Sequence, residues 1–335
     1  MLSAGGLVAF PTETVYGLGG DAFNPGALAK IFEVKGRPRF DPLIVHIADT
    51  DALGNVADLD ALDVAARKKL EALTESLWPG PLTLVLPKRK AVPDLATSGL
   101  PTVAVRVPAH ETARRLIALS SGAVAAPSAN PFGYISPTLA EHVVQTLGEK
   151  VDLILDGGPA RVGVESTVLD IRGERPAILR PGGTPREAIE ALIGWVSAAP
   201  SGGAVGVDGG SGNDGRVSPG MLKSHYAPRS PLTVHEGVSV CDLSPADETG
   251  AAFLFFDGAS RDAWLSGRSP EKGSAEMPVV AVLSETGDAL EAAARLFQTM
   301  HELDRLNPGR IHAQLAPERG LGAAINDRLR RGSGG

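Results

Sequence analysis

The chain has 335 residues, of which 43% are hydrophobic, and its 39 acidic and 32 basic side chains give a formal net charge of −7. This length exceeds one typical domain, so we expect two globular units with packed cores. The acidic balance excludes a protein that coats nucleic acid or anionic lipid through a general Lys and Arg excess, so an anionic ligand must be bound by a local cluster.

The single cysteine, Cys241, excludes an internal disulfide and a cysteine-rich zinc site, and it fits a reducing cytosol. The apolar run 251–256 is too short to cross a bilayer, and the first residues lack the basic-then-apolar pattern of a signal peptide. We therefore expect a cytoplasmic protein without a membrane partner.

Short apolar runs alternate with helical patterns through the first 195 residues, which is typical of an α/β domain. Strands are predicted at 6–10, 42–47, 82–86, 103–107, 123–126, 153–155, 166–171 and 177–179. A first helix is expected to begin with Asn24 as N-cap and Pro25 at N1 and to end at Gly36. Further helices are predicted at 62–73, 111–119, 139–147 and 186–193. Because several strands follow one another without a helix between them, we predict a mixed, twisted sheet.

The composition changes at 201–215, where seven of fifteen residues are glycine, which predicts a flexible linker. Beyond it we expect strands at 253–256 and 279–283, an amphipathic helix over 290–303 and a closing helix over 323–329 after a tight glycine-rich entry. We therefore predict a catalytic α/β domain at 1–196, a linker segment at 197–228 and a smaller, Rossmann-like α/β domain at 229–331.

Several familiar motifs are absent from the sequence. There is no Gly-Lys pair and hence no Walker A loop, and the G-x-G-x-x-G match formed by Gly210, Gly212 and Gly215 falls in the linker. Neither G-x-S-x-G nor H-E-x-x-H occurs. A nucleotide site, if present, must therefore be built without a standard short motif.

Small polar or basic residues follow several of the predicted strands. Lys35 and Arg37 could bind phosphates, although a solvated basic loop at a helix C-terminus is the alternative. Arg106 interrupts an apolar strand and requires an anionic partner, which is either a structural acid or a ligand carboxylate. Ser136 could simply cap the helix that follows it. Five strand ends that carry small polar or basic residues in this way indicate one shared pocket.

Nine motifs together resemble the threonylcarbamoyl-AMP synthase family, in the family's order. They are PTETVYGLG (11–19), KGRP (35–38), PLIVHI (42–47), WPGPLT (78–83), VRVPAH (105–110), PSAN (127–130), SPT (136–138), ESTVLD (165–170) and LRPG (179–182). SPGMLKSHYAP (218–228) and GLGAAINDRL (320–329) resemble the long, two-domain form. The resemblance implies a YrdC-like twisted open sheet with a concave, basic cavity, followed by an accessory domain.

The implied reaction converts L-threonine, bicarbonate and ATP into threonylcarbamoyl-AMP and pyrophosphate, without a covalent enzyme intermediate. The product supplies a threonylcarbamoyl group to the adenosine beside the anticodon of tRNA through downstream transfer machinery. The resemblance assigns catalysis to Lys35 and Arg37, and L-threonine binding to Thr14, His46, Arg106 and Ser166. It assigns ATP to Arg37, Asp41, Thr102, Ser128, Asn130, Ser136, Arg180 and Tyr226. Mg²⁺ is expected to enter with ATP, and the segment around Lys223, His225 and Tyr226 is hypothesised to act as a lid.

Two departures and two alternatives accompany this interpretation. Asp41 stands where the family often has Asn, and family members usually carry a further helix before the first strand. A related domain occurs in hydrogenase-maturation carbamoyltransferases, but those carry zinc-binding cysteine pairs, which one cysteine cannot supply. A non-catalytic RNA-binding module that uses a local basic patch is the other alternative.

Overall fold

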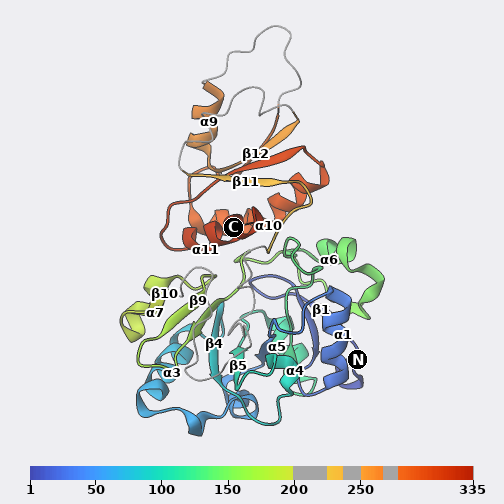
Figure 1. Cartoon of the computed structure of the whole chain (residues 1–335), viewed down its shortest axis with the longest axis vertical. Helices are drawn as coiled ribbons and strands as arrows, with labels where there is room; N and C mark the ends of the chain where they lie inside the picture. Colours follow the sequence, from blue (N-terminus) through green and yellow to red (C-terminus); the bar gives the residue numbers. More distant parts are fainter. Residues whose placement is uncertain (199–224, 237–249, 267–277, 335) are drawn as a thin grey trace. The chain divides into compact units, whose positions relative to one another are not determined.

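The computed structural model describes residues 1–198, 225–236, 250–266 and 278–334 (Figure 1). The chain forms two compact units. Unit 1 comprises Met1–Phe132, Ser136–Arg161 and Glu165–Leu222, and unit 2 comprises Gly133–Ile135, Val162–Val164 and Lys223–Gly335. The predicted linker at 201–215, Lys223 and Cys241 lie outside the described residues. Two short segments from the first half of the chain thus group with the C-terminal residues, which no sequence pattern predicts.

Unit 1 is built on a ten-stranded sheet with the order β10-β9-β8-β4-β5-β3-β6-β2-β1-β7. Its strands are β1 (Val8–Phe10), β2 (Gly17–Asp21), β3 (Ile44–Ile47), β4 (Leu82–Pro87), β5 (Thr102–Arg106), β6 (Ala123–Ala125), β7 (Leu153–Ile154), β8 (Thr167–Asp170), β9 (Ala177–Arg180) and β10 (Ser197–Ala198). Strands β3 and β5 are parallel, whereas β4 and β5 are antiparallel. The predicted mixed sheet is therefore confirmed, although β2, which is mostly glycine, was not predicted.

Seven helices accompany this sheet in the described part of unit 1. They are α1 (Pro25–Lys35), α2 (Leu53–Val56), α3 (Val64–Leu77), α4 (Asp94–Thr97), α5 (Glu111–Ala118), α6 (Ala140–Thr146) and α7 (Arg186–Ile193), with 3-10 turns at Leu2–Ala4, Thr50–Ala52, Leu59–Ala61 and Gly148–Lys150. The Asn24 side chain accepts from Gly26 N and Ala27 N at the start of α1, and Gly36 ends the helix with φ 63°, as predicted.

Helix α6 begins within one residue of its predicted start, but Ser136 does not have the capping role that was considered for it. Ser136 does not cap this helix, because α6 begins at Ala140 and its N-cap residue, Leu139, makes no side-chain cap bond. Ser136 Oγ instead donates to Glu165 Oε1. The Ser136 hydroxyl therefore serves to link this segment to Glu165.

Alternation along the strands divides the sheet of unit 1 into two faces. Val45 of β3 and Val105 of β5 point into the main core, which also contains residues of α1, α3 and α7. The neighbouring positions, His46 and Arg106, are register partners and therefore lie side by side on the opposite face. Thr83 of β4 is flanked by two core leucines and lies on this second face as well. The period-two pattern thus collects polar side chains on one face of an otherwise apolar sheet.

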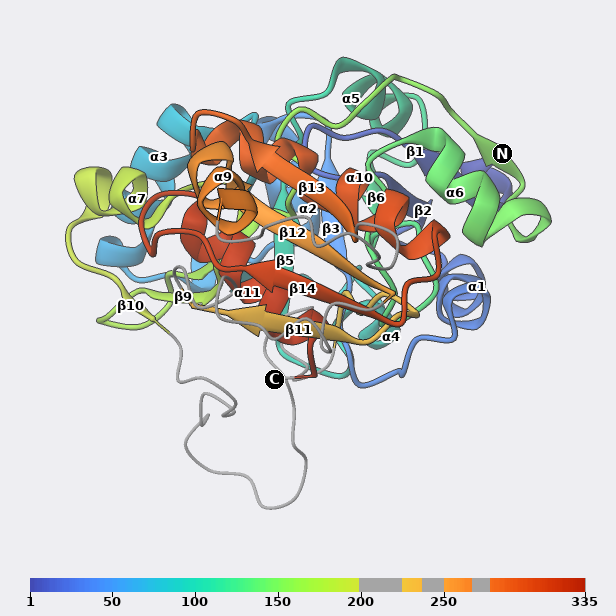
Figure 2. The same cartoon turned by 90° about the horizontal axis from the view of Figure 1, so that it is seen from above.

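Unit 2 contains a four-stranded, all-parallel sheet with the order β11-β14-β12-β13 (Figure 2). Its strands are β11 (Leu232–His235), β12 (Ala251–Asp257), β13 (Val279–Ser284) and β14 (Arg310–Gln314), and its helices are α9 (Gly258–Ser266), α10 (Ala289–Arg305) and α11 (Gly322–Gly332). Within this unit, Figure 1 shows α9 on one side of the sheet and α10 and α11 on the other. The predicted second α/β unit is confirmed.

The tight entry predicted for the closing helix is present. Gly320 has φ 55°, and a Cβ atom on Gly322 would lie 1.9 Å from Pro317 O. Only glycine fits there, because the chain passes too close to itself for a side chain.

Candidate active site

Arg106, the last residue of β5, is held by three neighbours. Its Nε donates to Gly80 O at 3.1 Å and its Nη1 donates to Thr14 Oγ1 at 2.9 Å. Its Nη2 lies 2.6 Å from Glu13 Oε1, and both side chains of this ion pair are less than one-tenth exposed. Of the two partners left open by the sequence, the structure supplies the acid: Glu13.

The hydroxyl groups beside Arg106 form an ordered chain. Thr12 Oγ1 donates to Val15 O at 2.7 Å, and it lies 2.8 Å from Thr14 Oγ1. Thr12 has one hydroxyl proton, so Thr14 is the donor between the two threonines, and the Thr14 oxygen accepts from Arg106. Thr14 is therefore oriented by contacts on both sides.

His46 lies beside Arg106 and is 4% exposed. Burial, and then the charge of Arg106, lower the pKa of His46 from 6.5 to about 3, so the imidazole is neutral at physiological pH. Its Nδ1 is buried without a hydrogen-bond partner in the part of the chain that the structure describes. The Phe10 ring lies at 90° to the imidazole in a T-shaped arrangement, with the ring centroids 6.3 Å apart.

Ser166 precedes β8 and links two further strands. Its Oγ lies 2.7 Å from Thr83 Oγ1. Arg180, at the end of β9, donates through Nη2 to Ser166 O at 2.9 Å and to Ser166 Oγ at 3.2 Å. Thr83 stands one position beyond the Leu84–Val105 pair of β4 and β5, so this group lies next to Arg106 on the same face.

Lys35 is the last residue of α1, and it is 3% exposed. Its Nζ donates to Ser128 O at 2.6 Å and to Asn130 O at 2.5 Å. Burial, and then the nearby charge of Arg37, lower the pKa of Lys35 well below its usual range, although Asp41 and Glu165 oppose this effect. Lys35 therefore ties α1 to the backbone of the segment that follows β6.

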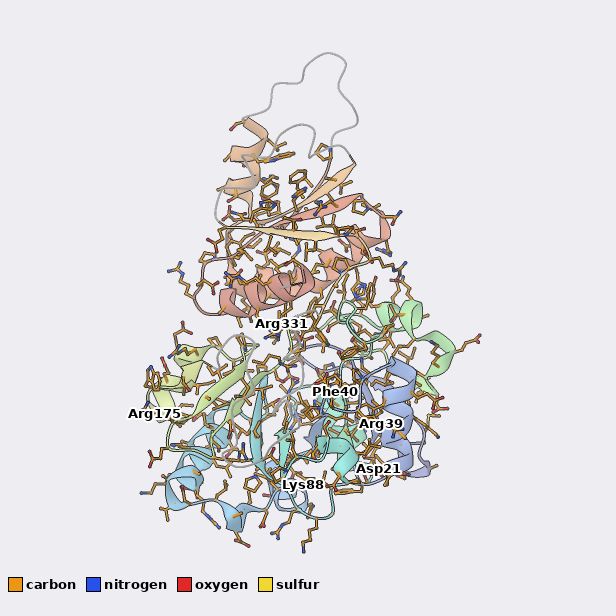
Figure 3. The ribbon with its side chains drawn as sticks, in the orientation of Figure 1. Asp21, Arg39, Phe40, Lys88, Arg175 and Arg331 are labelled. Atoms are coloured by element: carbon orange, nitrogen blue, oxygen red, sulfur yellow. The ribbon has the colours of Figure 1, made fainter. Side chains whose placement is uncertain are left out.

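Arg37 is also buried, with 7% of its surface exposed. Its Nη2 lies 2.9 Å from Asp41 Oδ2, and its guanidinium also donates to the backbone carbonyls of Asp41 and Pro42. The exposed side chains of this loop are instead those of Arg39 and Phe40, which Figure 3 labels, while Gly36 is exposed but has no side chain. The alternative of a solvated basic loop is therefore wrong for both Lys35 and Arg37.

Glu165 connects these groups. It accepts from Ser136 Oγ, its charge acts on Lys35, and it is the residue directly before Ser166. Four basic side chains (Lys35, Arg37, Arg106 and Arg180) and three acidic ones (Glu13, Asp41 and Glu165) thus share one buried polar region. An anion that enters this region competes with these carboxylates for the basic side chains.

The remaining predicted residues have no direct side-chain contact with Arg106 among the contacts described above. Thr102 begins β5 on the face of Arg106, but four residues earlier, which is roughly 13 Å along a strand. Ser128 pairs with Gly17 in an isolated bridge, and Asn130 Nδ2 donates to Pro131 O. Tyr226 belongs to unit 2, where its ring packs against Phe297, so its contact with ATP stays a prediction.

A separate open pocket of about 440 Å³ contains none of these residues. It is lined by Ala48, Asp49, Thr50, Glu71, Thr74, Glu75, Trp78, Pro79, Val107 and Arg114. The buried polar region, and not this pocket, contains the candidate site.

Comparisons with known proteins agree with this arrangement. The family model described as "Telomere recombination" matches residues 1–182, and the model "Threonylcarbamoyl-AMP synthase, C-terminal domain" matches residues 184–334. The chain belongs to the threonylcarbamoyl-AMP synthase family. It is 42% identical to the threonylcarbamoyl-AMP synthase of Pyrococcus abyssi over 330 residues, which cover 98% of this chain and 91% of that protein.

Other members of the threonylcarbamoyl-AMP synthase family show the same extent of similarity. The Bacillus subtilis enzyme is 40% identical, with 98% of this chain and 90% of that protein covered. The crystal structure of P. abyssi Sua5 complexed with L-threonine superposes with a TM-score of 0.83 and 39% identity, over 99% of this chain and 92% of that one. The predicted family, adenylyltransferase-type enzyme class and two-unit α/β fold are confirmed.

Three side chains in the site of this threonylcarbamoyl-AMP synthase received no role from the sequence: Glu13, Thr83 and Glu165. Two of them are acids within family motifs, and each stands directly before a residue predicted to bind threonine, Thr14 or Ser166. Their place in the sequence, directly before a predicted threonine-binding residue, was the signal that could have revealed them. What hid their roles is that both acids pair with side chains far away in the sequence.

Proposed function

We propose that this threonylcarbamoyl-AMP synthase condenses L-threonine, bicarbonate and ATP into threonylcarbamoyl-AMP, pyrophosphate and water. The observation that carries the proposal is the grouping of Thr14, His46, Arg106 and Ser166 on one face of the sheet, in a chain similar over almost its full length to a protein solved with L-threonine. These four residues are proposed to bind the amino acid.

The chemistry proceeds by carboxylation of the threonine amine, followed by attack of a carbamate oxygen on the α-phosphorus of ATP with loss of pyrophosphate. Such a step depends on positioning and charge neutralisation more than on a protein nucleophile. Arg37 and Arg180 are proposed to offset the negative charge of the phosphates. A polyphosphate beside Lys35 favours the charged ammonium, and this opposes the lowering of its pKa by burial.

Lys35 has a positioning role in this proposal. By donating to the carbonyls of Ser128 and Asn130, it fixes the backbone of a segment proposed to contact ATP. Asp41 acts in the same way on Arg37, since the two side chains pair directly. The remaining proposed ATP contacts are Thr102, Ser136 and Tyr226.

Mg²⁺ is proposed to arrive with ATP. Within the described ranges, no group of three or more His, Cys, Asp or Glu side chains could hold a metal ion. Asp41 contacts Arg37 and Glu165 contacts Ser136, so phosphate oxygens and waters fit this ion better than the protein does. When bound, the ion would neutralise part of the phosphate charge.

The product is proposed to donate its threonylcarbamoyl group, through separate transfer machinery, to the adenosine beside the anticodon of tRNA, and a cytoplasmic location stays a prediction. None of the described helices is long and apolar enough to cross a membrane. Contact between this chain and RNA is a further prediction.

The test is direct. Purified protein with ATP, Mg²⁺, bicarbonate and L-threonine is expected to release pyrophosphate and to form threonylcarbamoyl-AMP, detected by mass spectrometry. Omission of threonine should abolish both signals, and Arg106→Gln should reduce them at least a hundredfold. Folded wild-type protein that releases pyrophosphate at the same rate with and without threonine would refute the proposed function.

A further inference from the structure

Glu13 is a buried carboxylate that the proposed mechanism does not use. It is 8% exposed, its Oε1 lies 2.6 Å from Arg106 Nη2, and the backbone amides of Ala109 and of Glu13 itself also act on the carboxylate. The consecutive residues Glu13 and Thr14 both contact Arg106, one at Nη2 and the other at Nη1. An ionised carboxylate has about four acceptor positions, so Glu13 can accept from a further donor. It lies directly beside Thr14 and Arg106 of the proposed threonine site.

Orientation of Arg106 does not require Glu13. Gly80 O and Thr14 Oγ1 are neutral acceptors that already fix two of the three guanidinium nitrogens. What Glu13 adds is charge, because it balances a cation that is 3% exposed. His46 adds no charge beside this pair, because its imidazole is neutral at physiological pH.

This balance fails if an incoming carboxylate alone pairs with Arg106. Glu13 would then share its buried cation with a second anion, which is unfavourable in a region of low dielectric constant. An α-amino acid removes the problem, since it brings its own cation next to its carboxylate. A zwitterion exchanges charge for charge and leaves no group buried without a counter-ion.

We propose that Glu13 and Arg106 act together as a clamp for the amino-acid zwitterion, in which Arg106 binds the α-carboxylate and Glu13 binds the α-ammonium. The inference rests on the proposed function and adds a specificity-determining residue to it. It explains why a carboxylate stands beside Thr14, in a site that otherwise needs to attract anions. Glu13 holds the substrate before carboxylation and is not assigned the role of a base.

The test compares three ligands: L-threonine, L-threoninol, which lacks the carboxylate, and (2S,3R)-2,3-dihydroxybutanoate, which lacks the ammonium. Dissociation constants are measured by calorimetry for the wild type, Glu13→Gln, Glu13→Asp and the surface control Glu33→Gln. The wild type should bind L-threonine at least tenfold more tightly than either analogue. Glu13→Gln should lose roughly tenfold to a hundredfold in threonine affinity, the range for a charge-assisted hydrogen bond.

The decisive readout is selectivity. Glu13→Gln should bind the dihydroxybutanoate as well as the wild type does or better, because Arg106 loses its competitor, while Glu13→Asp should restore part of the preference for threonine. A merely structural Glu13 predicts equal weakening of all three ligands. That result would overturn the inference. Wild-type protein that binds the dihydroxybutanoate as tightly as threonine would overturn it too, and this comparison does not depend on the folding of any variant.

The inference and the proposed function can fail separately. Wild-type protein that prefers the zwitterion but forms no threonylcarbamoyl-AMP would refute the function alone. Protein that forms the product, with unchanged ligand selectivity in Glu13→Gln, would refute the clamp alone.

Discussion

Arg37 Nη2 lies 2.9 Å from Asp41 Oδ2, and the two side chains are 4% and 0% exposed. Both residues lie in the connection between α1 and β3. Arg37 also donates to the backbone carbonyls of Asp41 and Pro42, so its side chain holds this connection together. Asp41 therefore acts on Arg37 directly, and its carboxylate is already neutralised before any phosphate enters. This explains how an acid is accommodated at position 41.

Replacing Asp41 separates its structural and ligand roles. Asp41→Ala leaves Arg37 as a buried cation without its acid, and we expect the free energy of unfolding to fall by about 3 kcal/mol. Asp41→Asn retains an oxygen acceptor and should cost less than half of that. Urea unfolding of both variants measures this difference, and KM for ATP should rise more in Asp41→Ala. Equal loss of stability in the two variants would contradict the assignment.

Lys35 is expected to act through the segment that it holds. Lys35→Met keeps most of the side-chain volume but leaves the carbonyls of Ser128 and Asn130 without their buried donor. We expect kcat/KM for ATP to fall by at least about a hundredfold, equivalent to roughly 3 kcal/mol. Lys30→Met, an exposed lysine on the same helix, is the matched control and should retain activity. Similar activity in the two variants would show that the tether is unimportant.

His46 makes the stability of unit 1 dependent on pH. Burial, and then Arg106, hold its folded-state pKa at about 3, below the unfolded value of 6.5. The unfolded chain therefore binds the proton first, so the stability present above pH 6.5 is lost progressively as the pH falls toward 3. Between pH 7.5 and 4.5, His46→Gln should lose about 3 kcal/mol less than the wild type. Urea titrations at both pH values test this, and identical losses would contradict it.

Gly182 provides a test of backbone proximity at the site. A Cβ atom there would lie 2.3 Å from Glu165 O and 2.4 Å from Ser166 C. Gly182→Ala must therefore displace the backbone that carries both residues, and we expect loss of threonine binding together with destabilisation of at least about 2 kcal/mol. Gly173→Ala is the control, since its nearest contact is an ordinary 3.9 Å. A Gly182→Ala variant that binds threonine in calorimetry as tightly as the wild type does would disprove this constraint.

Tyr134 tests the grouping of residues in unit 2. Its hydroxyl donates to Asp304 Oδ2 at 2.6 Å, while Asp304 Oδ1 accepts from the amides of Arg229 and Ser230. Burial, and then Asp304, raise the pKa of Tyr134 to about 12, so the hydroxyl remains a donor at any ordinary pH.

Tyr134→Phe should lower the free energy of unfolding by about 2 kcal/mol through loss of a hydrogen bond to a charged acceptor. Asp304→Ala should cost more, because two amides lose their acceptor as well. Denaturant unfolding measures the loss of stability in both variants. A Tyr134→Phe variant as stable as the wild type would refute the stabilising role of this hydrogen bond.

The local elements could be predicted closely because their causes are local. Asn24, Pro25 and Gly36 set the ends of α1 through capping and backbone geometry, and α7 has the bounds expected from its apolar pattern. Strand β14 was missed because it has only two apolar residues, and the polar residues His312 and Gln314 are buried beside them. Its burial comes from neighbouring strands and helices, which a short window of sequence does not contain.

The amino-acid sequence by itself determined the α/β class, the family and the residue types of the site, since these follow from short-range patterns and contiguous motifs. Only the tertiary structure decided the partners. Glu13 and Arg106 are 93 positions apart, as are Lys35 and Ser128, yet each pair meets because strand pairing and helix packing bring distant segments together. Charge balance depends on distance in space and not along the chain, so the acids that neutralise or complete the site became visible only after folding.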